Sequence, residues 1–213
     1  MPQVFSLRRV LLIKLGSLVL LIVVAATLVV MHWQMQYPNA VGAPVRQPIP
    51  FSHKHHVGDD GIDCRYCHTS VERGSSAGLP STQICLSCHS QLFSDANIFN
   101  PLFSSMQSNR SVVWTRVHDL PDFVYFDHSI HVAKGVACVE CHGRIDQMPL
   151  TWRVASLDMQ WCLDCHRAPQ PHLHAANEIF AMPPPAVSNG EQLSGFYHLR
   201  SRQRLTDCST CHR

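Results

Sequence analysis

The longest uninterrupted run of apolar positions lies near the start of the chain, from Val10 to Met31. It carries one charge, Lys14, close to its beginning. About 20 apolar residues in a helix cross the hydrocarbon core of a bilayer. A lysine one turn inside such a helix can extend its ammonium back to the interface. The run therefore predicts a transmembrane helix.

The charges around this run predict its orientation. Arg8 and Arg9 precede it, and the next Lys or Arg after it is Arg46. Because positive residues stay on the cytoplasmic side, the amino terminus is expected in the cytoplasm and the rest on the periplasmic side. Trp33 and Tyr37 would then lie at the far interface.

A cleaved signal peptide is the alternative for the same segment. Its apolar region would span only about 7–15 residues and end in a small-residue cleavage site, which does not follow this run. We therefore expect residues 1–37 to be a retained single-pass anchor. Residues 38–50 contain four prolines and few apolar side chains, and they predict an extended linker to a domain over residues 51–213.

After residue 50 the apolar pattern loses its regularity and a motif takes its place. Every cysteine of the chain belongs to a Cys-x-x-Cys pair, and a histidine follows each pair directly. The five copies are Cys64-Cys67-His68, Cys85-Cys88-His89, Cys138-Cys141-His142, Cys162-Cys165-His166 and Cys208-Cys211-His212. In a c-type haem site the two sulfurs bind the porphyrin vinyl groups, and the adjacent histidine is the proximal iron ligand. The motifs therefore predict five covalently bound haem c groups.

Zinc and disulfides are the alternative uses of paired cysteines. Two Cys-x-x-Cys pairs can hold zinc in a tetrahedral site, but zinc does not require a histidine after each pair. Disulfides leave the histidines equally unexplained.

The formal charge of +2 and the charged fraction of 15% favour neither nucleic acid nor a polybasic membrane patch.

An internal repeat suggests roles for further histidines. Phe51-Ser52-His53-Lys54-His55-His56 aligns with Phe126-Asp127-His128-Ser129-Ile130-His131, both with the pattern Phe-x-His-x-x-His. Two haem motifs follow each copy, which predicts di-haem units over residues 51–100 and 126–170 and a fifth haem at 205–213. Two imidazoles three residues apart share one face of a helical turn and can serve two different irons. The distal ligands expected from the repeat are His53, His56, His128 and His131, whereas His55 is expected to be exposed.

The fifth distal ligand stays open. His118 is the first choice and Met159 the second. A thioether ligand would raise the potential of that haem relative to haems with two histidine ligands. The further candidates are His172, His174 and His198, whereas His32 is expected at the membrane interface.

The haems themselves would form much of the core of residues 51–213. The predicted fold class is accordingly mainly α with extensive loop: a haem-packed multihaem cytochrome with short helices at the motifs and almost no sheet. The segments Ser90–Asp122 and Ala168–Leu205 hold no haem motif and are expected to be wrapping loops that contact partner subunits.

The chain resembles known multihaem cytochromes. The repeat is similar to small class III cytochromes, and four segments are similar to the pentahaem cytochrome c subunit of alternative complex III: CRYCHTSVE, RVHDLPDFVYFDHSIHV, MQWCLDCHR and LTDCSTCHR. The resemblance implies a membrane complex that oxidises quinol and passes electrons to a soluble periplasmic acceptor. It further implies an iron–sulfur protein, quinol-binding membrane subunits and a mono-haem cytochrome c as partners.

Electron relay is the function that we expect, with both axial positions of each iron filled and no catalytic site in this chain. A multihaem reductase is one alternative, but it needs an iron with an open position. An anchored quinol dehydrogenase of the NapC/NrfH type, working with one soluble reductase, is another. A membrane-tethered storage cytochrome is a third.

Overall fold

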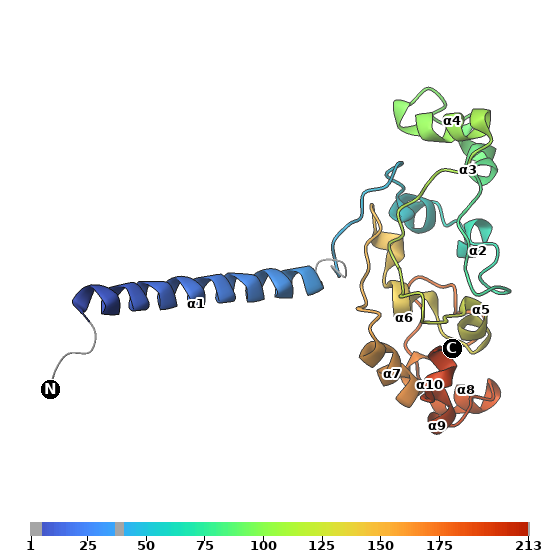
Figure 1. Cartoon of the computed structure of the whole chain (residues 1–213). Coiled ribbons are helices and arrows are strands. Elements are labelled where there is room, and N and C mark those ends of the chain that lie inside the picture. Colours follow the sequence, from blue (N-terminus) through green and yellow to red (C-terminus); the bar gives the residue numbers. More distant parts are fainter. Residues whose placement is uncertain (1–5, 37–40, 213) are drawn as a thin grey trace. The chain divides into compact units, whose positions relative to one another are not determined.

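The structure is a computed structural model that describes residues 6–36 and 41–212. It divides into two compact units, Met1–Ala40 and Val41–Arg213, each of which is considered by itself (Figure 1). Tyr37 and the first three residues of the predicted linker, 38–40, lie outside the described residues.

The first unit is one long helix, α1 (Leu7–Gln36). Leu7–Trp33 has a mean hydropathy of 2.6, and none of its most apolar window is buried within the protein. The helix is therefore long and apolar enough to cross a membrane, as the sequence predicts. Its length and composition do not reveal its orientation.

The second unit consists of short helical segments joined by long irregular stretches. Their bounds are η2 (Lys54–Asp59), α2 (Cys64–Cys67), α3 (Thr82–His89), η3 (Asn97–Phe99), α4 (Asn100–Ser108), α5 (His128–Ala133), α6 (Cys138–His142), η4 (Ile145–Gln147), α7 (Met159–Arg167), η5 (Gln170–His172), α8 (Gly190–Phe196), α9 (Arg202–Leu205) and α10 (Cys208–Cys211). Within the described residues, extended pairing is limited to two isolated bridges, Val124 with His212 and Val136 with Leu173. The mainly helical fold class with extensive loop is thus confirmed.

The two segments expected to be wrapping loops contain helices of their own. Pro101 occupies the first turn of α4, where its missing N–H costs nothing, and Leu102 and Ser105 form its buried face. The segment between 168 and 205 contains η5, α8 and α9, and η5 packs against α8. The expectation of continuous loop was wrong there because the contacts that stabilise these short helices are tertiary.

Buried apolar side chains are few and scattered along residues 41–212. They are Ile49, Val71, Leu102, Ala137, Met148, Ala155, Leu173, Ile179 and Tyr197. Many large apolar side chains, including Phe93, Phe123 and Met159, are at least 63% exposed. The polypeptide alone therefore forms a small core, which fits a domain whose interior is shared with large apolar cofactors.

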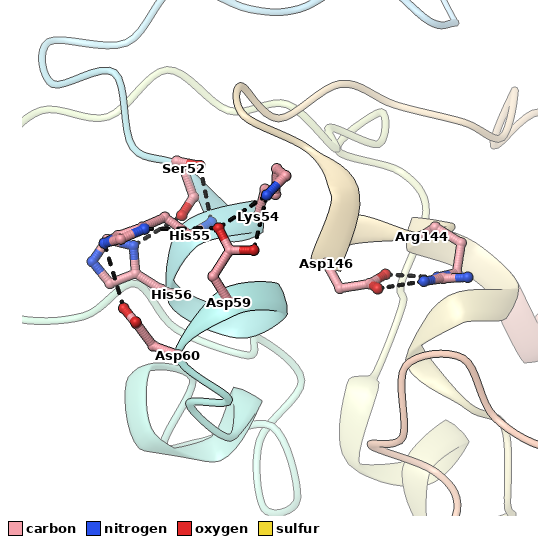
Figure 2. Close-up of polar contacts among 8 residues, drawn as sticks. All are labelled: Ser52, Lys54, His55, His56, Asp59, Asp60, Arg144 and Asp146. Carbon is pink, nitrogen blue, oxygen red and sulfur yellow. Dashed lines mark hydrogen bonds and ion pairs between the residues drawn. The ribbon is translucent and has the colours of Figure 1, made fainter.

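The closest packing between elements distant in sequence joins η2 to η4. The Lys54 N–H donates to the Met148 carbonyl at 3.0 Å. Gly58 approaches the backbone oxygen of Asp146 so closely that a Cβ there would overlap it. Arg144 holds the Asp146 carboxylate through two hydrogen bonds, one of 2.7 Å from Nε (Figure 2). This contact fixes the first Phe-x-His-x-x-His segment beside the third haem motif.

Candidate haem-binding sites

Each cysteine motif forms a short helix in the second unit. Asp63 and Asp207 precede the first and last motifs directly, and their carboxylates accept from the N–H of Arg65 and Ser209 at 2.8 and 2.9 Å. Such N-caps satisfy helix donors that otherwise lack a partner. The N–H of the motif histidine then bonds the first cysteine's carbonyl at 2.9 Å in both motifs. One helical turn thereby gathers two sulfurs and one imidazole.

All ten cysteines are free thiols. Within residues 6–36 and 41–212, no three His, Cys, Asp or Glu side chains converge as a site that could hold a metal ion. A zinc site of four thiolates and a disulfide framework therefore have no counterpart in the geometry. The cysteines are instead arranged as five separate pairs, one pair in each motif.

Thiol proximity orders the five motifs in space. A hydrogen bond with Cys64 raises the pKa of the Cys138 thiol, so motifs one and three are in contact. Burial, and then the neighbouring Cys85, raises the pKa of the Cys67 thiol, which joins motifs one and two.

The second half of the chain continues this order. Burial, and after it the nearby Cys165, raises the pKa of Cys141 to about 12. Burial, followed by Cys211, raises the pKa of Cys162. The spatial order of the motifs is thus two, one, three, four, five. Figure 1 shows the same progression within the second unit, from α3 through α2 and α6 to α7 and α10.

Four of the five motif histidines share one hydrogen-bonding arrangement, in which Nδ1 donates to a backbone carbonyl. The pairs are His68 with Gly78 (2.8 Å), His89 with Leu92 (3.1 Å), His166 with Leu205 (2.8 Å) and His212 with Phe123 (3.2 Å). A carbonyl only accepts, so Nδ1 carries the proton of the neutral ring and Nε2 keeps its lone pair. This is the second-shell contact that prepares a histidine to bind a metal through Nε2.

The predicted distal histidines are held in the same way. Nδ1 of three of them donates to a carbonyl, and that of the fourth meets a hydroxyl. The pairs are His56 with Ser52 (2.8 Å), His128 with Ser75 (2.8 Å), His131 with Asp127 (2.7 Å) and His53 with Thr151 Oγ1 (2.9 Å). In these predicted distal histidines, as in the four motif histidines above, Nε2 is therefore available to bind iron.

The two copies of the repeat have matching ring geometry. Phe51 meets the ring of His53 edge-on at 4.8 Å and stacks on that of His56 at 4.4 Å. Phe126 repeats both contacts, with His128 at 4.7 Å and with His131 at 4.5 Å. The phenylalanine of the sequence pattern thus orients both imidazoles, a role that the pattern itself could have revealed.

Ring spacing tests whether an iron fits between these histidines. A metal–imidazole bond is about 2 Å and the ring centroid lies about 1 Å beyond, so two axial imidazoles have centroids about 6 Å apart. The observed centroid separations are 6.1 Å for His56 and His89, 6.1 Å for His131 and His166, and 6.4 Å for His128 and His142. In three cases the spacing therefore fits one iron with two imidazole ligands.

The fourth pair belongs to a larger histidine cluster. Burial lowers the pKa of His53 to about 4, and the neighbouring His68 is the next cause. In the second copy of the repeat, the equivalent histidines are His128 and His142, whose rings also face each other. Burial also lowers the pKa of His142 to about 3, with His118 as the next contributor. A low pKa keeps each ring neutral at physiological pH, which is the form that binds iron.

His118 also lies in this cluster. Its ring is 4.3 Å from that of His142, which is too short for an iron between them. Its Nε2 is buried and has no hydrogen-bond partner. Its role as the fifth distal ligand stays a prediction.

The other candidates for the fifth distal position lie in different surroundings, and their role stays a prediction. Glu140 accepts from Nδ1 of His172 at 2.6 Å and bonds Nε2 of His174 at 3.2 Å, which leaves His174 Nδ1 buried and without a partner. The Met159 side chain is 66% exposed, and His198 is exposed in a left-handed backbone conformation.

Two histidines outside the candidate ligands lie on the surface. His55 is 60% exposed and faces Asp59 and Asp60 (Figure 2). His32 is exposed on α1. The exposure of His55 agrees with the sequence analysis, whereas the place of His32 at a membrane interface stays a prediction.

Two features of the sites were not predicted from the sequence. The Glu140–His172–His174 cluster ties the third motif to the segment after the fourth, and Arg153 is a buried cation close to His118. No local pattern marks either feature, because both arise from contacts between distant segments.

Comparison with known proteins agrees with these sites. A family model described as "Cytochrome c7 and related cytochrome c" matches residues 124–213. The multihaem cytochrome c subunit of menaquinone reductase from Nitratidesulfovibrio vulgaris is 40% identical over 107 residues. That stretch is 50% of this chain and 50% of the relative, so the chain spans about half the length of the curated relative it matches. Residues 124–213 are therefore similar to cytochrome c7 and related cytochromes c, and half of the chain is similar to a multihaem cytochrome c subunit.

Proposed function

We propose that this chain holds five haem c groups and relays electrons between a membrane quinone pool and a soluble partner. The observation that carries the proposal is the set of three histidine pairs whose ring centroids are 6.1–6.4 Å apart, in which every ring except that of His142 is held through Nδ1. A haem iron with two imidazole ligands gains and loses one electron without binding a substrate.

The chain's own residues have defined tasks in this proposal. The ten cysteines attach the haems, and His68, His89, His142, His166 and His212 are the proximal ligands. His53, His56, His128 and His131 are the distal ligands, in the di-haem units 51–100 and 126–170, with the fifth haem at 205–213. A carbonyl that accepts from Nδ1 fixes the ring and raises its basicity in seven of these nine histidines, all except His53 and His142.

Motif order favours a relay over storage. The thiols of neighbouring motifs meet in the order two, one, three, four, five, so every site adjoins at least one other. A storage cytochrome has no need for a continuous row with two free ends. The row supports motifs two and five as the termini at which partners exchange electrons.

The relative's name supports a quinone-linked complex. We assign the chain, by its resemblance, to a complex of the alternative complex III type, with an iron–sulfur protein, quinol-binding membrane subunits and a mono-haem cytochrome c as partners. In that setting α1 is a single-pass anchor with its amino terminus in the cytoplasm, and residues 51–213 lie in the periplasm.

Electron flow in the opposite direction is the second candidate, because the relative is a subunit of a menaquinone reductase. A periplasmic donor would then reduce menaquinone through the same row of sites. Quinol oxidation faster than quinone reduction in the purified complex supports the first direction, and the reverse result supports the second.

Haem content and subunit composition test the proposal. Intact mass and the alkaline pyridine spectrum should give five haems for each chain, all low-spin by electron paramagnetic resonance. Mild detergent should release a large assembly that carries iron–sulfur clusters. A haem count below five refutes the site assignment, whereas a small anchor–reductase pair supports the NapC/NrfH type instead.

A further inference from the structure

Arg153 is a buried cation that has no counter-ion among the described residues. Arg153 is only 5% exposed, and its Nη2 atom is buried and makes no hydrogen bond. Among the described residues, no carboxylate forms an ion pair with it. Burying a charge costs several kcal/mol unless an anion compensates, and a guanidinium is not relieved by losing its proton. The position therefore requires an anionic partner.

The surroundings of Arg153 place that partner beside the third haem motif. The next residue, Val154, packs so tightly on Gly143 that a Cβ there would lie 2.8 Å from a valine methyl carbon. Gly143 follows His142 directly. His118, whose ring is 4.3 Å from that of His142, is close enough to Arg153 to experience its charge.

Each haem carries two propionates, and a guanidinium binds a carboxylate through two parallel hydrogen bonds. We propose that Arg153 is the anchor for a propionate of the haem held by Cys138, Cys141 and His142. This inference rests on the proposed function only in requiring a haem at that motif. A carboxylate from a partner protein is the other source of the same chemistry.

The charge of Arg153 favours the reduced state of the adjacent haem, because reduction removes a positive charge from the iron. Replacing it by glutamine leaves the propionate uncompensated and favours the oxidised state. We expect R153Q to lower the ratio of reduced to oxidised haem at one site about tenfold at fixed potential, which equals about 59 mV for one electron.

The test is a spectroelectrochemical titration of the full chain, purified without partners, for wild type, R153Q, R153K and R116Q. Arg116 is the matched control, since its side chain is 79% exposed and pairs with Asp119. R153Q should shift one haem downward with all haems attached, R153K should shift it less, and R116Q should shift none. Unchanged midpoints in R153Q, an equal shift in R116Q, or a shift that appears only with partner subunits would overturn the proposal.

Haem content separates the two levels of inference. If the wild type lacks a haem at Cys138, the proposed function fails; if the haem is present and R153Q leaves its potential unchanged, only the role of Arg153 fails. If R153Q loses haem, R153K takes its place in the test, because lysine keeps the positive charge but cannot make two parallel hydrogen bonds to the propionate. A propionate band in the resonance Raman spectrum of R153K that differs from the wild-type band then supports the contact, and an unchanged band refutes it.

Discussion

Replacing His56 by alanine should leave one haem without its distal ligand. His56 lies with its ring 6.1 Å from that of His89 and with Nδ1 held by the Ser52 carbonyl at 2.8 Å. The neighbouring His55 is a matched control, because it is 60% exposed and pairs with Asp59 and Asp60 (Figure 2). The two variants remove the same chemical group one residue apart.

The structural cost of H56A is small enough for the protein to remain folded. The lost hydrogen bond contributes about 1 kcal/mol, and the stacking on Phe51 at 4.4 Å contributes about 1 kcal/mol more. Domains of this size are stable by about 5–15 kcal/mol. The variant should therefore keep its haems, and the change should be one of coordination.

Electron paramagnetic resonance of the ferric protein is the assay. With one iron in five losing a strong ligand, about one fifth of the haem should become high-spin in H56A, and added imidazole should restore the low-spin signal. H55A should match the wild type. Fully low-spin haem in H56A at complete haem loading would refute the assignment of His56.

Three further predictions follow from contacts in the structure. G58A should lower the melting temperature by several degrees, because its Cβ overlaps the backbone oxygen of Asp146, whereas G195A, with nothing within 4 Å of its Cβ, should not; equal melting curves by circular dichroism would contradict this. D207A removes the N-cap of α10 and should cost about 1 kcal/mol in denaturant unfolding, and an unchanged midpoint would contradict the capping role. Replacing residues 7–33 by a cleavable export signal should release a haem-loaded domain from membranes. Persistence of this domain in the membrane fraction would show that α1 is not the sole anchor.

Sequence predicted the elements that depend on local spacing. The apolar run from Val10 to Met31 became a single helix because a long apolar segment satisfies its own backbone hydrogen bonds. Cys64 to His68 became one helical turn that Asp63 caps, and the Phe-x-His-x-x-His copies reproduced their ring contacts. In each case the partners are at most five residues apart, so composition and spacing define the geometry.

Helices α4, α8 and α9 were missed for the opposite reason. Each is short and lacks a strong apolar period, so its stability comes from neighbours that the local sequence does not reveal. The position of His118 beside His142 was missed likewise, since the two residues come together only when the chain folds.

By itself, the sequence determined the chemistry of this protein: an apolar helix long enough to cross a membrane, cysteine pairs each followed by histidine, and a duplicated histidine segment. These are properties of neighbouring residues, fixed by bond lengths and helical spacing. Only the tertiary structure decided which histidine of the duplicated segment faces which motif, the order two, one, three, four, five, and the burial of Arg153 with no counter-ion among the described residues. Those features join segments tens of residues apart, such as Cys64 and Cys138, and packing of the whole domain rather than spacing along the chain brings them together.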